Sequence, residues 1–139
     1  MIVLDTNVLS ALMTPQLNPE PIAWLDKQPA TLVWTTAVNV FESRAGIRLL
    51  PSGKRRDGLD AALDALIAQM LADRILPFDH AAAEAAATIA GSRITKGINI
   101  GARDTQIAGI VVSRGASLAT RNLKDFSDLK IDLLNPWQS

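Results

Sequence analysis

The chain alternates between short apolar runs and longer segments in which apolar residues recur at helical spacing. The short runs are rich in Val, Ile, Leu and Thr, which is typical of buried strands. The expected strands are residues 2–4, 31–35, 74–78, 117–120 and 131–134. Because strands separated by helices pair in parallel and are covered on both faces, the pattern predicts a small α/β sandwich.

The segments between these runs predict helices. They are expected at residues 8–13, 22–27, 37–50, 57–72, 79–95 and around 107–112. Asp79 is a favourable N-cap for the Ala-rich helix, and Gly115 is expected to end the last helix. An apolar stripe on the helix at 57–72 predicts its buried face, which consists of Leu59, Leu63, Leu66, Ile67 and Met70.

The length of 139 residues suits one domain, which we expect to span residues 1–139. The chain has no Cys and only one His, His80, so the sequence excludes disulfides, thiolate zinc sites and histidine-rich metal sites. Any bound metal must therefore be held by oxygen atoms. Oxygen ligands favour Mg²⁺ or Mn²⁺ over Zn²⁺.

Charge and hydropathy limit the partners. The N-terminus lacks the basic start of a signal peptide, and no window approaches the roughly 18 apolar residues of a membrane span, so we expect a cytoplasmic protein. Fourteen basic and fourteen acidic residues cancel, so a polyanion would be attracted only by a local patch or by bound cations. The basic patch Lys54-Arg55-Arg56 is the one obvious candidate, although a solvated helix start explains it equally simply.

Asp5 directly follows the first predicted strand. Ligands of open α/β sheets bind just beyond the carboxyl ends of parallel strands, so Asp5 lies where chemistry is usually done. A second interpretation is that Asp5 only caps the following helix. Thr120, Asn122 and Asp125 follow another predicted strand in the same way, and a polar turn is the structural alternative for them.

Two further acids lie at positions where apolar residues are expected. Glu42 shares a helical stripe with Val38, Ala45 and Leu49, and Asp104 shares one with Ile107, Ala108 and Val111. A buried carboxylate needs a cation, which is either a metal or a basic side chain such as Arg44, Arg48 or Arg103. If Asp5, Glu42 and Asp104 converge, a divalent cation would relieve their mutual repulsion.

These residues resemble the PIN-domain nucleases, and more narrowly the VapC toxins of type II toxin–antitoxin systems, in their FitB-like branch. The resemblance covers essentially the whole chain and includes the C-terminal Leu134-Asn135-Pro136-Trp137. Its main motifs, in chain order, are Leu4-Asp5-Thr6-Asn7, Glu42 after Thr35-Thr36, Asp104 within Arg103-Asp104-Thr105-Gln106, and Ala119-Thr120-Arg121-Asn122 with Asp125-Phe126.

The resemblance implies a PIN-like three-layer sandwich with a mostly parallel central sheet of about five strands. It also implies an Mg²⁺- or Mn²⁺-dependent endoribonuclease in which Asp5, Glu42 and Asp104 match the three core acids. The fourth acid of the family falls on Asn122, so either the metal is bound more weakly or Asp125 supplies the missing carboxylate. Thr6 and Thr120 would orient these groups. Arg121, Lys54 and Arg55 would contact the RNA phosphates.

The same resemblance implies the partners. A VapC-like chain is expected to form a homodimer and to bind a cognate antitoxin whose C-terminal segment occupies the acidic groove. The complex would bind operator DNA only through the antitoxin, in agreement with the neutral charge of this chain.

Two other functions remain open from the sequence. Phosphatases of the haloacid dehalogenase type also begin with an apolar strand that ends in a nucleophilic Asp, but they need a second Asp where this chain has Asn7. The second alternative is a catalytically weak PIN-fold binding module, which the Asn122 substitution favours.

Overall fold

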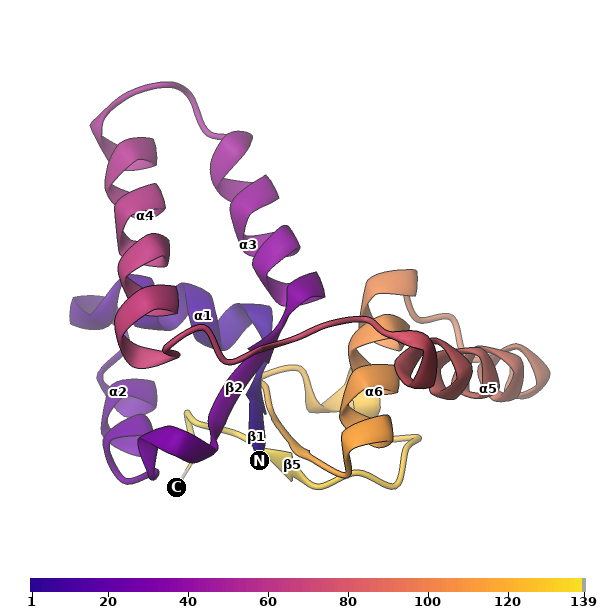
Figure 1. Ribbon diagram of the computed structural model, residues 1–139. Coiled ribbons are helices and arrows are strands. Elements are labelled where there is room, and N and C mark those ends of the chain that lie inside the picture. The colour runs from indigo at the N-terminus through magenta and orange to yellow at the C-terminus, as the bar shows by residue number, and fades with distance from the viewer. Residues whose placement is uncertain (139) are drawn as a thin grey trace.

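A computed structural model describes residues 1–138 and has a five-stranded sheet at its centre (Figure 1). The strand order is β3-β2-β1-β4-β5, and every neighbouring pair is parallel. The strands are β1 (Ile2–Leu4), β2 (Val33–Thr36), β3 (Ile75–Leu76), β4 (Ser117–Ala119) and β5 (Leu133–Leu134). Each lies within or beside a predicted strand, so the α/β prediction is confirmed.

Within residues 1–138, six α-helices lie around the sheet. They are α1 (Thr6–Met13), α2 (Pro19–Asp26), α3 (Ala37–Arg48), α4 (Lys54–Ala65), α5 (His80–Lys96) and α6 (Ala102–Arg114). A π-helical turn, η3 (Leu66–Met70), continues α4, and a 3-10 turn, η4 (Leu123–Phe126), follows β4. No helix within residues 1–138 is long and apolar enough to cross a membrane.

Some boundaries differ from the prediction for local reasons. α1 begins at Thr6, two residues early, because the Asp5 carboxylate accepts a hydrogen bond from the Thr6 amide. α2 begins at Pro19, since proline is well tolerated in the first helical turn. β2 begins at Val33 because residues 30–32 form a 3-10 turn.

The core lies on the two faces of the sheet. Val3 and Leu118 point to one face, where they pack with buried residues of α5 and α6. Leu4 and Ala119 point to the opposite face, which is covered by α1 and, with partly buried residues, by α2 and η3. This arrangement is the expected three-layer sandwich.

The buried face of α3 is one residue away from the predicted stripe. Leu49, placed on that stripe by its spacing, is 87% exposed. The buried residues are instead Asn39, Ser43 and Ile47, and Glu42 lies beside them, partly exposed. By contrast, the stripe predicted for α4 and η3 is correct, because Leu63 is fully buried and its other members are partly buried.

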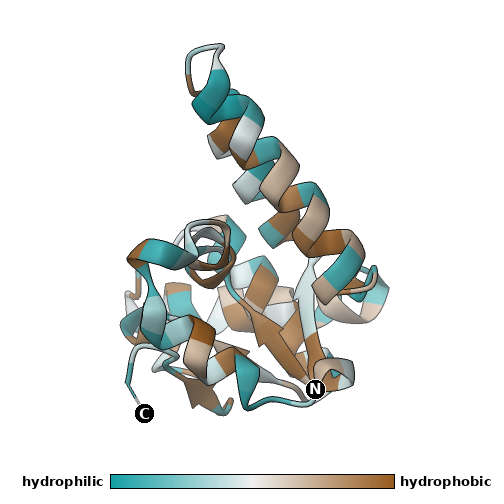
Figure 2. Cartoon of the chain, turned by 90° about the vertical axis from the view of Figure 1, so that its left-hand side faces the viewer, coloured by the Kyte–Doolittle hydropathy of each residue, from teal (hydrophilic) through white to brown (hydrophobic). Residues whose placement is uncertain are grey.

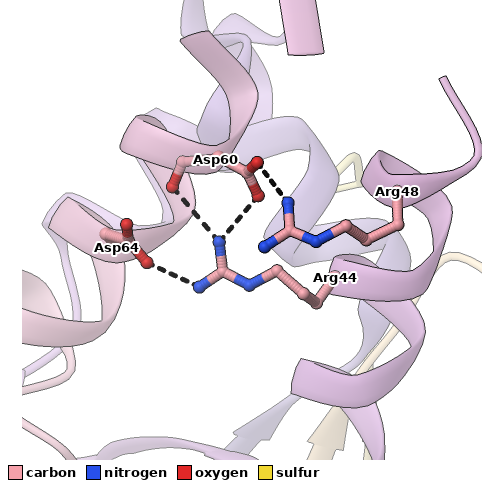
Figure 3. Close-up of polar contacts among 4 residues, drawn as sticks. All are labelled: Arg44, Arg48, Asp60 and Asp64. Atoms are coloured by element: carbon pink, nitrogen blue, oxygen red, sulfur yellow. Dashed lines mark hydrogen bonds and ion pairs between the residues drawn. The ribbon is translucent and has the colours of Figure 1, made fainter. Parts of the chain in front are cut away.

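The helices α3 and α4 form a hairpin that projects away from the sheet, with hydrophilic residues gathered at its tip (Figures 1 and 2). Ion pairs join the two helices across the hairpin: Arg44 to Asp60 (2.9 Å) and Asp64 (2.5 Å), and Arg48 to Asp60 (Figure 3). Arg44 and Arg48 are therefore engaged with α4 and do not neutralise Glu42.

Gly109→Ala tests the close packing of α5 against α6. A Cβ atom at Gly109 would lie 2.6 Å from the Ala82 carbonyl oxygen and 2.7 Å from the Ala86 Cβ. Because the backbone carbonyl cannot move away cheaply, we expect a loss of about 2 kcal/mol in the free energy of unfolding, measured by urea denaturation. The matched control is Gly91→Ala in α5, which has open space and should gain up to about 1 kcal/mol. Equal stability of the two variants would contradict this packing.

Candidate active site

The polar site lies at the carboxyl edge of the sheet, where the strand order reverses. β1 pairs with β2 on one side and with β4 on the other, so the connections leave β1 in opposite directions. Such a switch point is the usual ligand-binding position of open α/β sheets. Asp5 follows β1, Thr36 ends β2, and Thr120 follows β4. The sheet thereby brings three distant segments together.

Asp5 is buried and fully hydrogen-bonded. Its Oδ1 accepts from the Thr6 amide (2.9 Å) and from Asn39 Nδ2 (3.0 Å), and its Oδ2 accepts from Thr120 Oγ1 (2.7 Å). Helix capping accounts for only one of these bonds. Burial raises the pKa of Asp5, the bonds from Thr120 and Thr6 oppose the rise, and the charge of Glu42 adds to it.

Glu42 reaches the same place from α3. Thr6 Oγ1 donates to Glu42 Oε1 at 2.9 Å, so one threonine links Glu42 to the Asp5 turn. The guanidinium of Arg103 lies 3.8 Å from Glu42 Oε2, and its side chain is 54% exposed. Of the three arginines considered as partners, only Arg103 approaches Glu42, and this pair is long and open to solvent.

Asp104 lies in the first turn of α6 and completes the convergence. Burial and, after it, the charges of Asp5, Asp125 and Glu42 together raise the pKa of Asp104 to about 6. A hydrogen bond with Asp125 also favours the protonated form. Asp104 therefore interacts with three other carboxylates that come from separate segments. We call these four residues the acidic cluster: Asp5, Glu42, Asp104 and Asp125.

Asn122 and Asp125 behave differently. Asn122 is exposed, and its backbone N–H donates to Thr120 Oγ1 at 3.0 Å. The backbone φ of Asn122 is −92°. Asn122 therefore does not adopt the left-handed conformation that Asn often adopts in a polar turn. Asp125, in η4, is partly buried and interacts with Asp104. The geometry thus brings Asp125, rather than Asn122, toward the other acids.

Asn39 is a site residue that the sequence analysis missed. It is fully buried, and its Nδ2 donates to both Asp5 Oδ1 and Thr6 Oγ1 at 3.0 Å. Thr36 Oγ1 donates to Asn39 Oδ1 at 2.6 Å and fixes the orientation of the amide. The available signal was a Thr N-cap followed three residues later by an amide side chain, a pattern close to the capping box.

Arg93 is a second missed residue. It is 2% exposed and binds three residues from two segments near the acidic cluster. Its guanidinium donates to both Asp128 oxygens, to Thr105 Oγ1 beside Asp104, and to the backbone carbonyl of Asp125. Arg93 therefore holds η4 and the start of α6 in a fixed relation.

The three basic residues that were predicted to contact RNA phosphates have different surroundings. Arg55 lines a hollow of about 430 Å³ together with Thr6 and Glu42. Arg121 is exposed, stacks over the ring of Trp137 at 4.7 Å, and donates its amide to Asn7 Oδ1. Lys54 is exposed at the start of α4, and no contact brings it to the acidic cluster.

The donor set fits a hard divalent cation. Its side chains offer only carboxylate oxygens, which suit Mg²⁺ and Mn²⁺, and their mutual repulsion is the electrostatic condition that a cation relieves. Within residues 1–138, no three acidic or His side chains form a ready-made cage. This is compatible with Mg²⁺, which is usually held by one or two carboxylates and completes its shell with water and substrate oxygens.

Asp104→Asn is expected to stabilise the metal-free protein. The variant removes one charge from the acidic cluster, and after screening by solvent we expect a gain of about 1 kcal/mol at about pH 7.5. Because the folded-state pKa of about 6 exceeds the usual 3.8, the native protein binds the extra proton as the pH falls, and its stability rises. The gain should therefore shrink at about pH 5, as thermal unfolding in EDTA would show. A gain in stability that does not change with pH would contradict the convergence of these carboxylates.

Comparison with known proteins agrees with this fold. A family model described as PIN domain matches residues 2–131, and the chain belongs to the PIN domain family. It is 37% identical to the VapC ribonuclease Y4jK of Sinorhizobium fredii over 138 residues, covering 99% of each chain. It is 38% identical to Toxin FitB of Neisseria gonorrhoeae over 137 residues, again covering 99% of each.

Solved structures give the same result. The FitAcB structure from Neisseria gonorrhoeae matches with a TM-score of 0.89 at 37% identity over 100% of both chains. The structure of FitAB bound to a DNA fragment also matches with a TM-score of 0.89, over 100% of this chain and 97% of the other. The expected PIN and FitB-like resemblance is confirmed, and the haloacid dehalogenase alternative is wrong.

Proposed function

We propose that this chain is a metal-dependent endoribonuclease that acts as the toxin of a toxin–antitoxin pair. The observation that supports this most directly is the acidic cluster, which gathers four carboxylates at the switch point of a PIN fold. The VapC ribonuclease and FitB toxin, both similar over nearly their full length, support the same activity.

In this proposal Asp5, Glu42, Asp104 and Asp125 hold the cation. When bound, Mg²⁺ or Mn²⁺ would supply Lewis acidity and would lower the pKa of a water molecule. Thr120 and Asn39 hold the two oxygens of Asp5 in place. Thr6 holds Oε1 of Glu42. Either Asp5 or Asp104 accepts the proton of the attacking water. Arg55 and Arg121 contact the phosphates of the RNA.

The partners proposed are a cognate antitoxin and a second copy of this chain. The support comes from similar proteins, since the matching FitAcB and FitAB structures are complexes and FitAB is bound to DNA. We propose that the antitoxin covers the acidic groove and that operator DNA is bound through the antitoxin. Light scattering after size-exclusion chromatography would contradict the homodimer if only a particle of about 15 kDa, the single-chain mass, were present.

The test is cleavage of a pool of structured RNAs, transfer RNAs included, by purified antitoxin-free protein. We expect cutting with Mg²⁺ or Mn²⁺ and none with EDTA, because without the cation no group activates the attacking water. Cutting that persists in EDTA would contradict the metal-dependent mechanism. Metal binding measured by calorimetry, without cutting of any RNA, would instead favour the binding module.

Exchanging the two candidates for the fourth acid distinguishes their roles. Asp125→Asn should lower metal affinity and cleavage about tenfold or more, because Asp125 interacts with Asp104. Asn122→Ala should leave both within about twofold, because the Asn122 side chain is exposed and only its backbone N–H, which the variant keeps, bonds to Thr120. Mn²⁺ titration and cleavage rates measure both effects. The reverse ranking would show that Asn122 completes the site.

A further inference from the structure

We propose that two arginine–aromatic pairs on either side of the acidic cluster bind the unpaired bases next to the scissile phosphate. The pairs are Phe41–Arg103 and Trp137–Arg121. This inference rests on the proposed ribonuclease function and deepens it, because it names the side chains that would contact the bases beside the cut.

The first pair lies at the Glu42 side of the cluster. Phe41 immediately precedes Glu42 and is 57% exposed, which is unusual for a large aromatic residue. The Arg103 guanidinium lies 5.0 Å from the centroid of the Phe41 ring and 3.8 Å from Glu42 Oε2. Arg103 therefore joins the exposed ring to the acidic cluster while half of its own side chain faces solvent.

The second pair lies at the Thr120 side of the cluster. Arg121 is exposed, and its guanidinium lies 4.7 Å from the Trp137 ring. Its amide donates to Asn7 Oδ1, while Asn7 Nδ2 donates to Thr120 Oγ1, the hydroxyl that binds Asp5. Beside this pair, a mostly polar hollow of about 280 Å³ extends along α1.

The two pairs occupy opposite sides of the sheet edge. Arg103 is on α6, which packs on the face of Val3 and Leu118, whereas Trp137 packs with Leu4 and Ala119 on the other face. The acidic cluster lies between them at the strand ends. A strand crossing this edge would place one phosphate at the cluster and a base at each pair.

The chemistry of the pairs suits unpaired nucleotides. Bases that are splayed from a single strand stack on aromatic rings and on the planes of arginine guanidinium groups. Both arginines also provide positive charge beside a cluster that would otherwise repel RNA. A duplex keeps its bases stacked inside, so neither pair could engage them.

The experiment measures binding of a short unpaired RNA containing 2-aminopurine, in EDTA, with a duplex of the same sequence as comparator. Arg103→Lys and Arg121→Lys keep the positive charge but remove the planar guanidinium group. Phe41→Leu keeps most of the apolar volume but removes the aromatic ring. We expect each to raise the Kd for the unpaired RNA about tenfold, or ~1.4 kcal/mol. Arg114→Lys, at the far end of α6 and paired with Asp79, is the control and should bind normally.

The outcomes separate this inference from the proposed function. Unchanged Kd values for all three variants, with metal-dependent cutting intact, would overturn the inference and leave the nuclease standing. Equal binding of duplex and single strand would also overturn it. Weakened binding by the variants of a protein that never cuts RNA would contradict the nuclease and, with it, the placement of the bases next to a scissile phosphate. If the variants lose only antitoxin binding, the ligand of the pairs is a peptide and the inference is overturned.

Discussion

Asp5→Asn is expected to lower the rate of metal-dependent RNA cleavage by about a hundredfold or more. Asp5 is the most buried member of the acidic cluster, and three hydrogen bonds fix both of its oxygens. The substitution removes its negative charge and one of the oxygens proposed to bind the metal, without changing its size. Cleavage of the RNA pool and Mn²⁺ titration would measure the loss.

The fold should tolerate this change. The amide oxygen can still accept from the Thr6 amide and Asn39. The Thr120 hydroxyl already accepts from the backbone N–H of Asn122 and from Asn7 Nδ2, so it can accept from the new NH₂ group only in exchange for the longer bond from Asn7. Because burial raises the pKa of Asp5, a neutral side chain also removes a desolvation cost. Asp26→Asn, at the exposed end of α2, is the matched control. Full activity of Asp5→Asn with a normal thermal transition would contradict the assignment of Asp5 to the site.

The sequence was most informative where a functional residue is placed by local pattern. Asp5 and Thr120 were found because they follow apolar strands, and Asp104 because it precedes the buried residues Ile107 and Ala108 on one helical stripe. Glu42 was found through a stripe that the structure shifts by one residue, which exposes Leu49. The shift arises because Asn39 and Ser43, both polar, occupy the buried face of α3.

The remaining site residues depend on contacts that no local pattern specifies. Asn39 is 34 residues away from Asp5 along the chain, and Arg93 is 35 residues from Asp128. A buried arginine in an Ala-rich helix resembles a solvated surface charge until its partners are placed in space. The parallel crossovers bring these partners together, so tertiary structure was needed to recognise them.

Arg93→Met should destabilise the protein by about 3 kcal/mol and weaken metal binding about tenfold. The variant keeps most of the apolar volume but leaves the Asp128 carboxylate and Thr105 hydroxyl without their donor. It also releases the Asp125 carbonyl, so the segment that contains Asp125 is no longer held against α6. Urea denaturation gives the first effect, and Mn²⁺ titration well below the unfolding transition gives the second.

The pH dependence of this destabilisation tests whether the loss of the Arg93–Asp128 ion pair causes it. The hydrogen bond from Arg93 lowers the pKa of Asp128 below its usual 3.8. A carboxyl group with a lowered folded-state pKa stabilises the protein above the unfolded value, and this stabilisation is lost as the pH falls through the folded value. The stability difference between wild type and Arg93→Met should therefore narrow below about pH 4. Arg114→Met removes an arginine that is 39% exposed and should cost less than about 1 kcal/mol. A difference for Arg93→Met that stays constant across this range would assign the loss to packing rather than to the ion pair.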